Sequence, residues 1–271
     1  MAAGGIAEPG SLQVHGVALA YWESGGGPPV LLLHETAAGA DVWRPLADAL
    51  AGDARVIALD RRGWGRSGAP EPYTRTTIEE QAEDAAGLLS ELGLAQALVG
   101  GAGLGAVAAL DLLVRRPGMV TGAVLIEPPL LAFVPDATEG LSSDRKTIEQ
   151  AVRDGGPAGA LELYLRGALP FLGPGAERIP DAACAGARDH PLSLFAELAS
   201  VPAWTIPTAE LAAVAAPALV VTCTSTPLPL ARCAEELAGR LSGAELVRLE
   251  GDGLPHVGAA PELAARLRSL L

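Results

Sequence analysis

The chain has 271 residues, enough to bury a sizeable core in one or two domains. Aspartate and glutamate number 32 against 19 lysines and arginines, and the net charge of −13 opposes binding to nucleic acid or to an anionic membrane. Three cysteines at irregular spacing indicate neither a disulfide framework nor a metal site, so we expect a cytoplasmic protein with no metal and no cofactor.

The first half of the chain alternates apolar runs with helical patterns. Residues 12–21 alternate in polarity around a His15-Gly16 turn, as two short strands would. Four mainly apolar segments are expected to be buried strands, and the first, 30–33, has no polar face, which is typical of a parallel strand covered on both sides. They lie at 30–33, 55–59, 94–99 and 122–126, with helical spacing at 41–50, 78–92 and 104–116. This alternation predicts a doubly wound, mostly parallel α/β sheet.

The alternation stops between 131 and 214, where helical pieces such as 147–152 and 158–165 are separated by turns rich in proline and glycine. We expect this segment to be an inserted helical cap, with 1–130 and 215–271 as the two parts of the α/β core. Strands at 218–222 and 245–249 and helices at 231–241 and 261–271 then complete the sheet. Pro217 interrupts the most apolar long stretch, so no transmembrane helix is expected.

The turn between the strand at 94–99 and the helix after it consists almost wholly of small residues, Gly101-Ala102-Gly103-Leu104-Gly105. It has the spacing of a nucleophile elbow, G-x-S-x-G, in which a serine is held in a strained, exposed turn. Gly103 stands at the serine position, and Ala102 stands there in an alternative register. Because no Ser, Cys, Asp or Glu lies between Val99 and Leu110, covalent catalysis from this turn is excluded.

Four motifs in this order resemble those of the α/β-hydrolase superfamily over nearly the whole chain. They are the elbow, the strand and histidine Val30-Leu31-Leu32-Leu33-His34, the D-x-R-G-x-G-x-S loop at 60–67, and a histidine loop at 251–262. The resemblance implies an α/β-hydrolase fold with an inserted helical cap. It also implies a hydrolase or lyase acting on a small molecule, although the elbow serine of the family is missing.

Members of this family carry a catalytic acid and a catalytic histidine, and the resemblance implies where this chain would place them. The loop after 218–222 holds no carboxylate, but some haloalkane dehalogenases carry the acid after an earlier strand, where this chain has Glu127. His256 lies two residues from Leu254, which occupies the usual histidine position. We expect Glu127 and His256 to lie within hydrogen-bond reach, directly or through one water. Glu127 pairing with an arginine, and His256 lying at the surface, are the alternatives.

Glu35 follows His34 where the family has glycine. A carboxylate there would repel a developing oxyanion, which argues against ester hydrolysis by the usual route and offers a general base instead. The alternative is that Glu35 turns to solvent or caps the next residues. His34 is a candidate substrate contact, although hydrogen bonding to nearby loop backbone would also explain it.

Phe133 and Trp204 lie in or beside the cap and are candidate walls of a pocket whose floor is Ala102, Gly103 and Leu104. Most such aromatic residues belong to a cap's own core.

Two functions are therefore open. The first is an enzyme that uses Glu35, Glu127 and His256 in general acid–base chemistry, of the hydrolase or the lyase and cyclase class, on a small to medium, mostly apolar substrate. The second is a catalytically inactive, receptor-like protein that binds a ligand under its cap.

Overall fold

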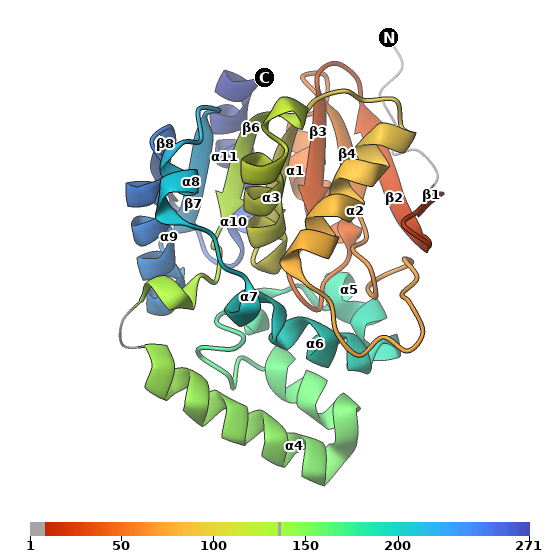
Figure 1. Ribbon diagram of the computed structural model, residues 1–271, viewed down its shortest axis with the longest axis vertical. Coiled ribbons are helices and arrows are strands. Elements are labelled where there is room, and N and C mark those ends of the chain that lie inside the picture. The colour runs from red at the N-terminus through yellow and green to blue at the C-terminus, as the bar shows by residue number, and fades with distance from the viewer. Residues whose placement is uncertain (1–8, 135–136) are drawn as a thin grey trace.

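The apolar runs of the sequence form one sheet of eight strands in the computed structural model, which describes residues 9–134 and 137–271 (Figure 1). The strand order is β1-β2-β4-β3-β5-β6-β7-β8, antiparallel from β1 to β4 and parallel between all later neighbours. The strands are β1 (Gly10–Val14), β2 (Val17–Gly25), β3 (Pro29–Leu33), β4 (Arg55–Leu59), β5 (Ala97–Ala102), β6 (Val120–Ile126), β7 (Ala218–Cys223) and β8 (Ala244–Leu249). The predicted mostly parallel sheet is confirmed.

Helices cover both faces of this sheet, which explains why its central strands lack a polar face. In β3, Leu32 packs with one hydrophobic cluster and Leu31 with the other, because neighbouring side chains of a strand point to opposite faces. One face is covered by η1 (Ala40–Trp43), α1 (Arg44–Ala49) and α11 (Ala260–Leu267), and the other by α2 (Ile78–Glu91), α3 (Leu104–Arg115) and α9 (Leu228–Arg240). The short elements η2 (Pro117–Met119) and α10 (Pro255–Gly258) lie in the connections between these helices and strands, and η6 (Arg268–Leu270) follows α11.

The helix boundaries follow local signals in the sequence. Thr77 begins α2 with a capping box, in which its side chain accepts from the backbone of Glu80 and the Glu80 carboxylate accepts from the backbone of Thr77. Pro117 follows the end of α3 directly, where it cannot continue the helical hydrogen bonds. These signals fix the core helices close to their predicted ranges.

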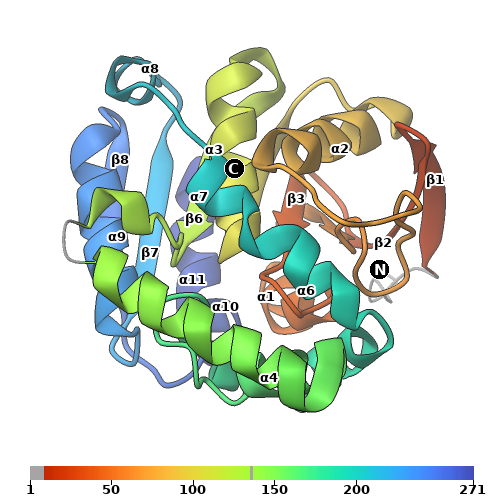
Figure 2. The ribbon, with the colours of Figure 1, turned by 60° about the horizontal axis from the view of Figure 1, so that its bottom comes forward.

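A helical insert between β6 and β7, called the cap below, lies at the carboxyl end of the parallel strands (Figures 1 and 2). Its elements are η3 (Leu131–Phe133), α4 (Ala137–Leu165), η4 (Ala176–Arg178), α5 (Asp181–Cys184), η5 (Ala185–Asp189), α6 (Pro191–Leu198), α7 (Ser200–Ala203) and α8 (Thr208–Ala212). The two helical pieces predicted at 147–152 and 158–165 are parts of α4, which bends at Gly156, where φ is 65° and ψ is −166°. Pro157 follows Gly156 and contributes to the bend, because proline lacks the N–H that a continuous helix needs.

Within the described ranges, none of the helices has the length and apolar character that crossing a bilayer requires.

Candidate functional site

Gly103 forms the sharp turn between β5 and α3. Its φ of 53° and ψ of −125° are a conformation that residues with a Cβ rarely adopt. Ala102, the alternative nucleophile position, is the last residue of β5. A Cβ on Gly105 would lie 2.2 Å from the carbonyl oxygen of Leu33, so α3 can begin this close to β3 only with glycine there. The structure thus places Gly103, and not Ala102, at the centre of the turn.

Glu35 occupies the space beside this turn. Glu35 lies two residues after the end of β3, and it is buried, with an exposed fraction of 7%. A Cβ added to Gly103 would lie 2.9 Å from the Cβ of Glu35, so this glutamate and a larger residue at position 103 compete for one volume. Neither carboxylate oxygen has a hydrogen-bond partner within the described parts of the chain. Glu35 therefore lines the cavity beneath the cap and does not turn to solvent.

His256 is the nearest titratable neighbour of Glu35. It lies on the short helix α10, is fully buried, and brings its Nε2 to 3.5 Å from Oε2 of Glu35. Neither of its ring nitrogens is hydrogen-bonded to any residue in 9–134 or 137–271. The imidazole and the carboxylate thus contact each other, and each keeps polar atoms that the protein leaves unpaired.

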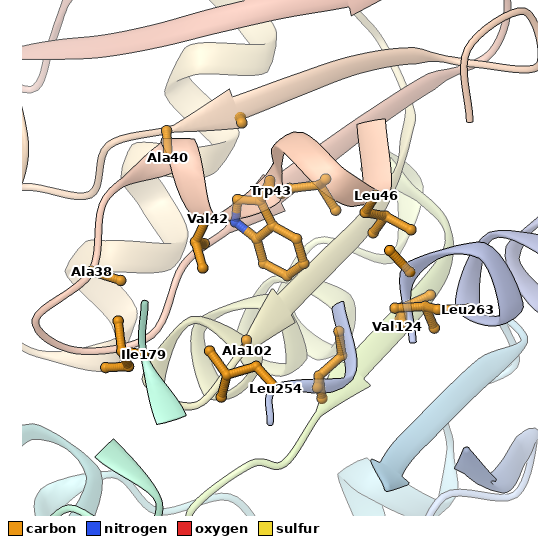
Figure 3. Packing of buried hydrophobic residues seen from close by; sticks show 14 of the residues in the cluster. Ala38, Ala40, Val42, Trp43, Leu46, Ala102, Val124, Ile179, Leu254 and Leu263 are labelled. Carbon is orange, nitrogen blue, oxygen red and sulfur yellow. The ribbon is translucent and has the colours of Figure 1, made fainter. Parts of the chain in front are cut away.

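The indole ring of Trp43 packs against the imidazole ring of His256. The centroids of the Trp43 and His256 rings are 4.3 Å apart, and their planes are inclined at 38°. Figure 3 shows the indole of Trp43 packed beside Val42 and facing Ala102 and Leu254. Because the indole is fully buried among these side chains, it leaves His256 little freedom to turn away from Glu35.

Glu127 and His256 were expected to contact each other directly or through one water, and the direct hydrogen bond is absent. The carboxylate of Glu127 follows β6 and is held by the guanidinium of Arg178, whose Nη1 donates to Oε1 at 3.0 Å and whose Nη2 donates to Oε2. The hydroxyl of Thr226 donates to the same Oε1. The alternative, an ion pair with an arginine, is what forms, because the planar guanidinium can bind both carboxylate oxygens at once.

Arg178 also reaches the histidine loop, since Nη1 donates to the carbonyl oxygen of Gly253 at 2.9 Å. Sequence analysis missed this residue. It lies in the glycine- and proline-rich cap, 51 residues from Glu127, and no local pattern marks it as that residue's partner. It joins the cap, the end of β6 and the loop before His256.

His34 does not line the cavity, so its predicted contact with substrate is corrected. Its Nδ1 donates to the carbonyl oxygen of Glu35 at 2.7 Å, and its Nε2 accepts from the backbone N–H of Arg61 at 2.9 Å. Burial, together with the nearby charge of Arg61, holds the pKa of His34 well below its ordinary value. His34 is therefore a neutral side chain that fixes the backbone of the loop carrying Glu35.

The cavity beneath the cap has a volume of about 450 Å³ and a mainly apolar wall. Its polar groups gather around Glu35 and His256, and its wall is built from the segments after β6 and from the cap. Of the residues predicted to contact a ligand, those that line the cavity are Ala102, Gly103, Leu104, Phe133 and Trp204. This size suits a small to medium molecule with an apolar body.

Two further polar contacts tie the cap to the core around this cavity. Glu197 of α6 binds the buried guanidinium of Arg61 and accepts from the hydroxyl of Thr36 at 2.8 Å. Trp204 donates from Nε1 to the carboxylate of Asp111 in α3 at 2.8 Å. Trp204 therefore presents its ring to the cavity while its polar end is satisfied by the core. The described residues contain no group of three or more side chains placed to hold a metal ion.

Comparison with known proteins agrees with this architecture. Residues 28–162 match the family model described as alpha/beta hydrolase fold. The uncharacterized hydrolase YraK of Bacillus subtilis is 37% identical over 125 residues, 46% of each chain. The 2-(acetamidomethylene)succinate hydrolase of Mesorhizobium japonicum is 30% identical over 159 residues, 58% of this chain and 54% of the relative. These matches span about half the length of the relatives.

Among solved structures, an alpha/beta hydrolase from Sphaerobacter thermophilus superposes with a TM-score of 0.71 at 25% identity. The match covers 96% of this chain and 99% of that one. The likeness in three dimensions therefore extends through the core and the cap.

Proposed function

The chain belongs to the α/β-hydrolase fold superfamily, and from that premise we propose that it is a hydrolase in which Glu35 and His256 act as a general acid–base pair in place of a nucleophilic serine. The observation that carries the proposal is the contact between this carboxylate and this imidazole beside the elbow, with four buried polar atoms unpaired by the described protein. The relatives named as hydrolases support the reaction class.

Unpaired polar atoms are the reason for assigning function to this pair. Buried side-chain oxygens and nitrogens are hydrogen-bonded in the large majority of cases, and leaving one unpaired is unfavourable by about 1–3 kcal/mol. Glu35 and His256 leave both carboxylate oxygens and both ring nitrogens unpaired at one place. A water or a polar group of a substrate would satisfy them, which is the arrangement that general acid–base catalysis requires.

The proposed reaction is addition of water to an electrophilic carbonyl. Glu35 removes a proton from the attacking water while the water oxygen bonds to the carbonyl carbon, and protonated His256 donates a proton to the leaving group. The proton on Glu35 then returns to His256 across their contact, which restores the starting state. The backbone N–H of Leu104, the first residue of α3, has no acceptor within its own helix, and we assign it as the donor to the developing negative charge.

Glu127 has a different part in this proposal. Because both oxygens of its carboxylate accept hydrogen bonds, from Arg178 and Thr226, we assign it no proton transfer. It positions the cap and, through Arg178, the loop that carries His256.

A screen for chemical change tests the proposal. Apolar esters, amides and lactones are incubated with the protein, and every recovered compound is identified by mass spectrometry. We expect the wild type to hydrolyse at least one compound, Glu35→Gln and His256→Gln to bind it without hydrolysis, and Glu250→Gln, a change at an exposed carboxylate, to behave as the wild type. A ligand that binds all four proteins and is always recovered unchanged would identify a receptor-like protein and contradict the proposal.

A further inference from the structure

An open apolar groove runs along the outer side of the cap, between α4 and the pair α6 and α7. It is separate from the cavity that holds Glu35. Its apolar side chains come from facing helices, Ile148 and Val152 on α4, Phe195 on α6 and Ala203 on α7, with Arg145 and Arg153 near its edge. Ala199 and Ala203 are exposed, so this surface is accessible from outside.

The groove and the cavity share a wall. The residues that line both spaces are Thr138, Leu141, Leu172, Leu198 and Pro202. All but Thr138 are apolar, and they come from α4, the segment before η4, α6 and α7. The groove and the cavity therefore meet at these five side chains.

The first part of α4, which supplies Thr138 and Leu141 to this wall, makes no side-chain hydrogen bond to the core within the described residues. The other cavity-lining segments are bound to the core by Arg178, Glu197 and Trp204. The hydrogen bonds of Asp144 in the first part of α4, in contrast, stay within the cap, where its carboxylate accepts from the backbone N–H groups of Phe171 and Leu172. Figures 1 and 2 show α4 as the outermost helix, lying across α6.

The bend in α4 adds a point about which this part of the helix can change its direction. Gly156 already has a non-helical backbone, and a Cβ added there would meet nothing within 4 Å. A small rotation of the first part of α4 about this bend would move Leu141 and leave the polar contacts of Arg178, Glu197 and Trp204 with the core in place.

We propose that the substrate is an elongated amphiphile, whose polar reactive group lies at Glu35 and His256 and whose apolar chain passes between Leu141 and Leu198 into the groove. This inference rests on the proposed function and names the substrate class of the same site. The occupant of the groove is the far end of that chain, because the same five side chains border the groove and the cavity and because both spaces have mainly apolar linings.

A binding series tests the proposal without requiring turnover. Straight-chain primary alcohols from butanol to decanol are titrated into the protein by calorimetry. Each methylene that leaves water for an apolar surface should raise affinity about fourfold. We expect the rise to continue through the longest alcohols in the wild type, because the chain extends from the cavity into the groove.

Ala203→Asp separates the groove from the cavity, since residue 203 lines only the groove and is exposed. We expect this variant to lose the gain for the longest alcohols and to keep the wild-type affinity for the shortest. Ala213→Asp is the matched control, because it places the same charge on an exposed cap residue outside both spaces, and it should bind the whole series as the wild type does.

The proposal is overturned if no alcohol binds, if the gain ends at the same length in wild type and Ala203→Asp, or if the control loses as much as Ala203→Asp. Repeating the series with Glu35→Gln separates this result from the chemistry. A failure of the proposed hydrolysis would leave the dependence on chain length unchanged, whereas a failure of the groove proposal would leave hydrolysis of compact substrates unchanged.

Discussion

Glu35 and Glu127 lie at the same edge of the sheet, Glu35 two residues after β3 and Glu127 directly after β6, and both line one cavity. Both are almost fully buried, with exposed fractions of 7% and 4%. Glu127 has both oxygens bound, by Arg178 and Thr226, whereas neither oxygen of Glu35 has a partner in the described residues. Burial and position do not distinguish these two carboxylates, but their hydrogen bonds do.

The comparison teaches that a carboxylate at a catalytic edge has a structural role when the protein satisfies it and is free for chemistry when the protein does not. A guanidinium that binds both oxygens stabilises the carboxylate in one orientation. An unpaired carboxylate beside an imidazole keeps its lone pairs for a ligand or a water. The four predictions below test this difference, beginning with the largest effect.

The first prediction compares activity after the same change at each site. Glu35→Gln should lower kcat/KM roughly a hundredfold to ten-thousandfold, the usual contribution of a positioned acid or base, with little loss of stability. Glu127→Gln should retain most of the activity of the fraction that remains folded. Steady-state kinetics on a substrate found in the screen measures both. Equal losses in the two variants would mean that hydrogen bonding does not separate the two carboxylates.

The second prediction compares stability. Glu127→Gln leaves the buried charge of Arg178 without its partner, so it should lower the free energy of unfolding by about 3 kcal/mol. Glu35→Gln should change it much less. Urea unfolding gives both values, and the double variant Glu127→Gln with Arg178→Met should recover part of the loss. A double variant that is less stable than both single variants would contradict the assignment of a structural ion pair.

The third prediction concerns the space that Glu35 shares with position 103. Gly103→Ser should be destabilised by about 2 kcal/mol, because the residue has a positive φ and its Cβ would lie 2.9 Å from that of Glu35. It should also lose activity, since Glu35 must move. Shortening the neighbour in Glu35→Gly with Gly103→Ser should recover part of the stability. If the changes in the free energy of unfolding of the two single variants add up to that of the double variant, the two positions do not share space and the prediction is wrong.

The fourth and smallest effect is a dependence of stability on pH through His34. Because the pKa of His34 is lowered in the folded protein, the unfolded chain binds the extra proton first as pH falls. Its contribution to stability is complete above about pH 6.5 and is lost as pH falls from there toward the folded pKa. Thermal unfolding from pH 7 to 5 should show this slope in the wild type and a smaller slope in His34→Asn. An identical slope in both proteins would contradict the neutral role of His34.

The sequence predicted the core well because its signals there are local. Continuous apolar runs such as Leu31 to Leu33 predict buried strands, and a proline such as Pro117 ends a helix where it stands. The cap was harder to predict, because α4 is a long helix with a mostly exposed surface and a bend at Gly156 that divides its pattern in two.

The sequence identified the residues of the candidate site more successfully than their pairing. Glu35, Glu127 and His256 all line the cavity, as the motif positions suggested. Which carboxylate meets His256 depends on Arg178, and that arginine is brought to Glu127 only by the path of the cap. Contacts of this kind form only when the chain folds, so the spacing of residues in the sequence does not predict them.

The measurement that tests the central claim most directly is one turnover in water enriched in heavy oxygen, followed by mass spectrometry of the product and of the peptide that contains Glu35. If Glu35 and His256 activate water, the heavy oxygen appears in the product of the wild type, the Glu35 peptide stays unlabelled, and Glu35→Gln gives no labelled product. Heavy oxygen in the carboxylate of Glu35 would show a covalent intermediate on that residue, and labelled product from Glu35→Gln at the wild-type rate would show that other groups activate the water. Either result would contradict the account.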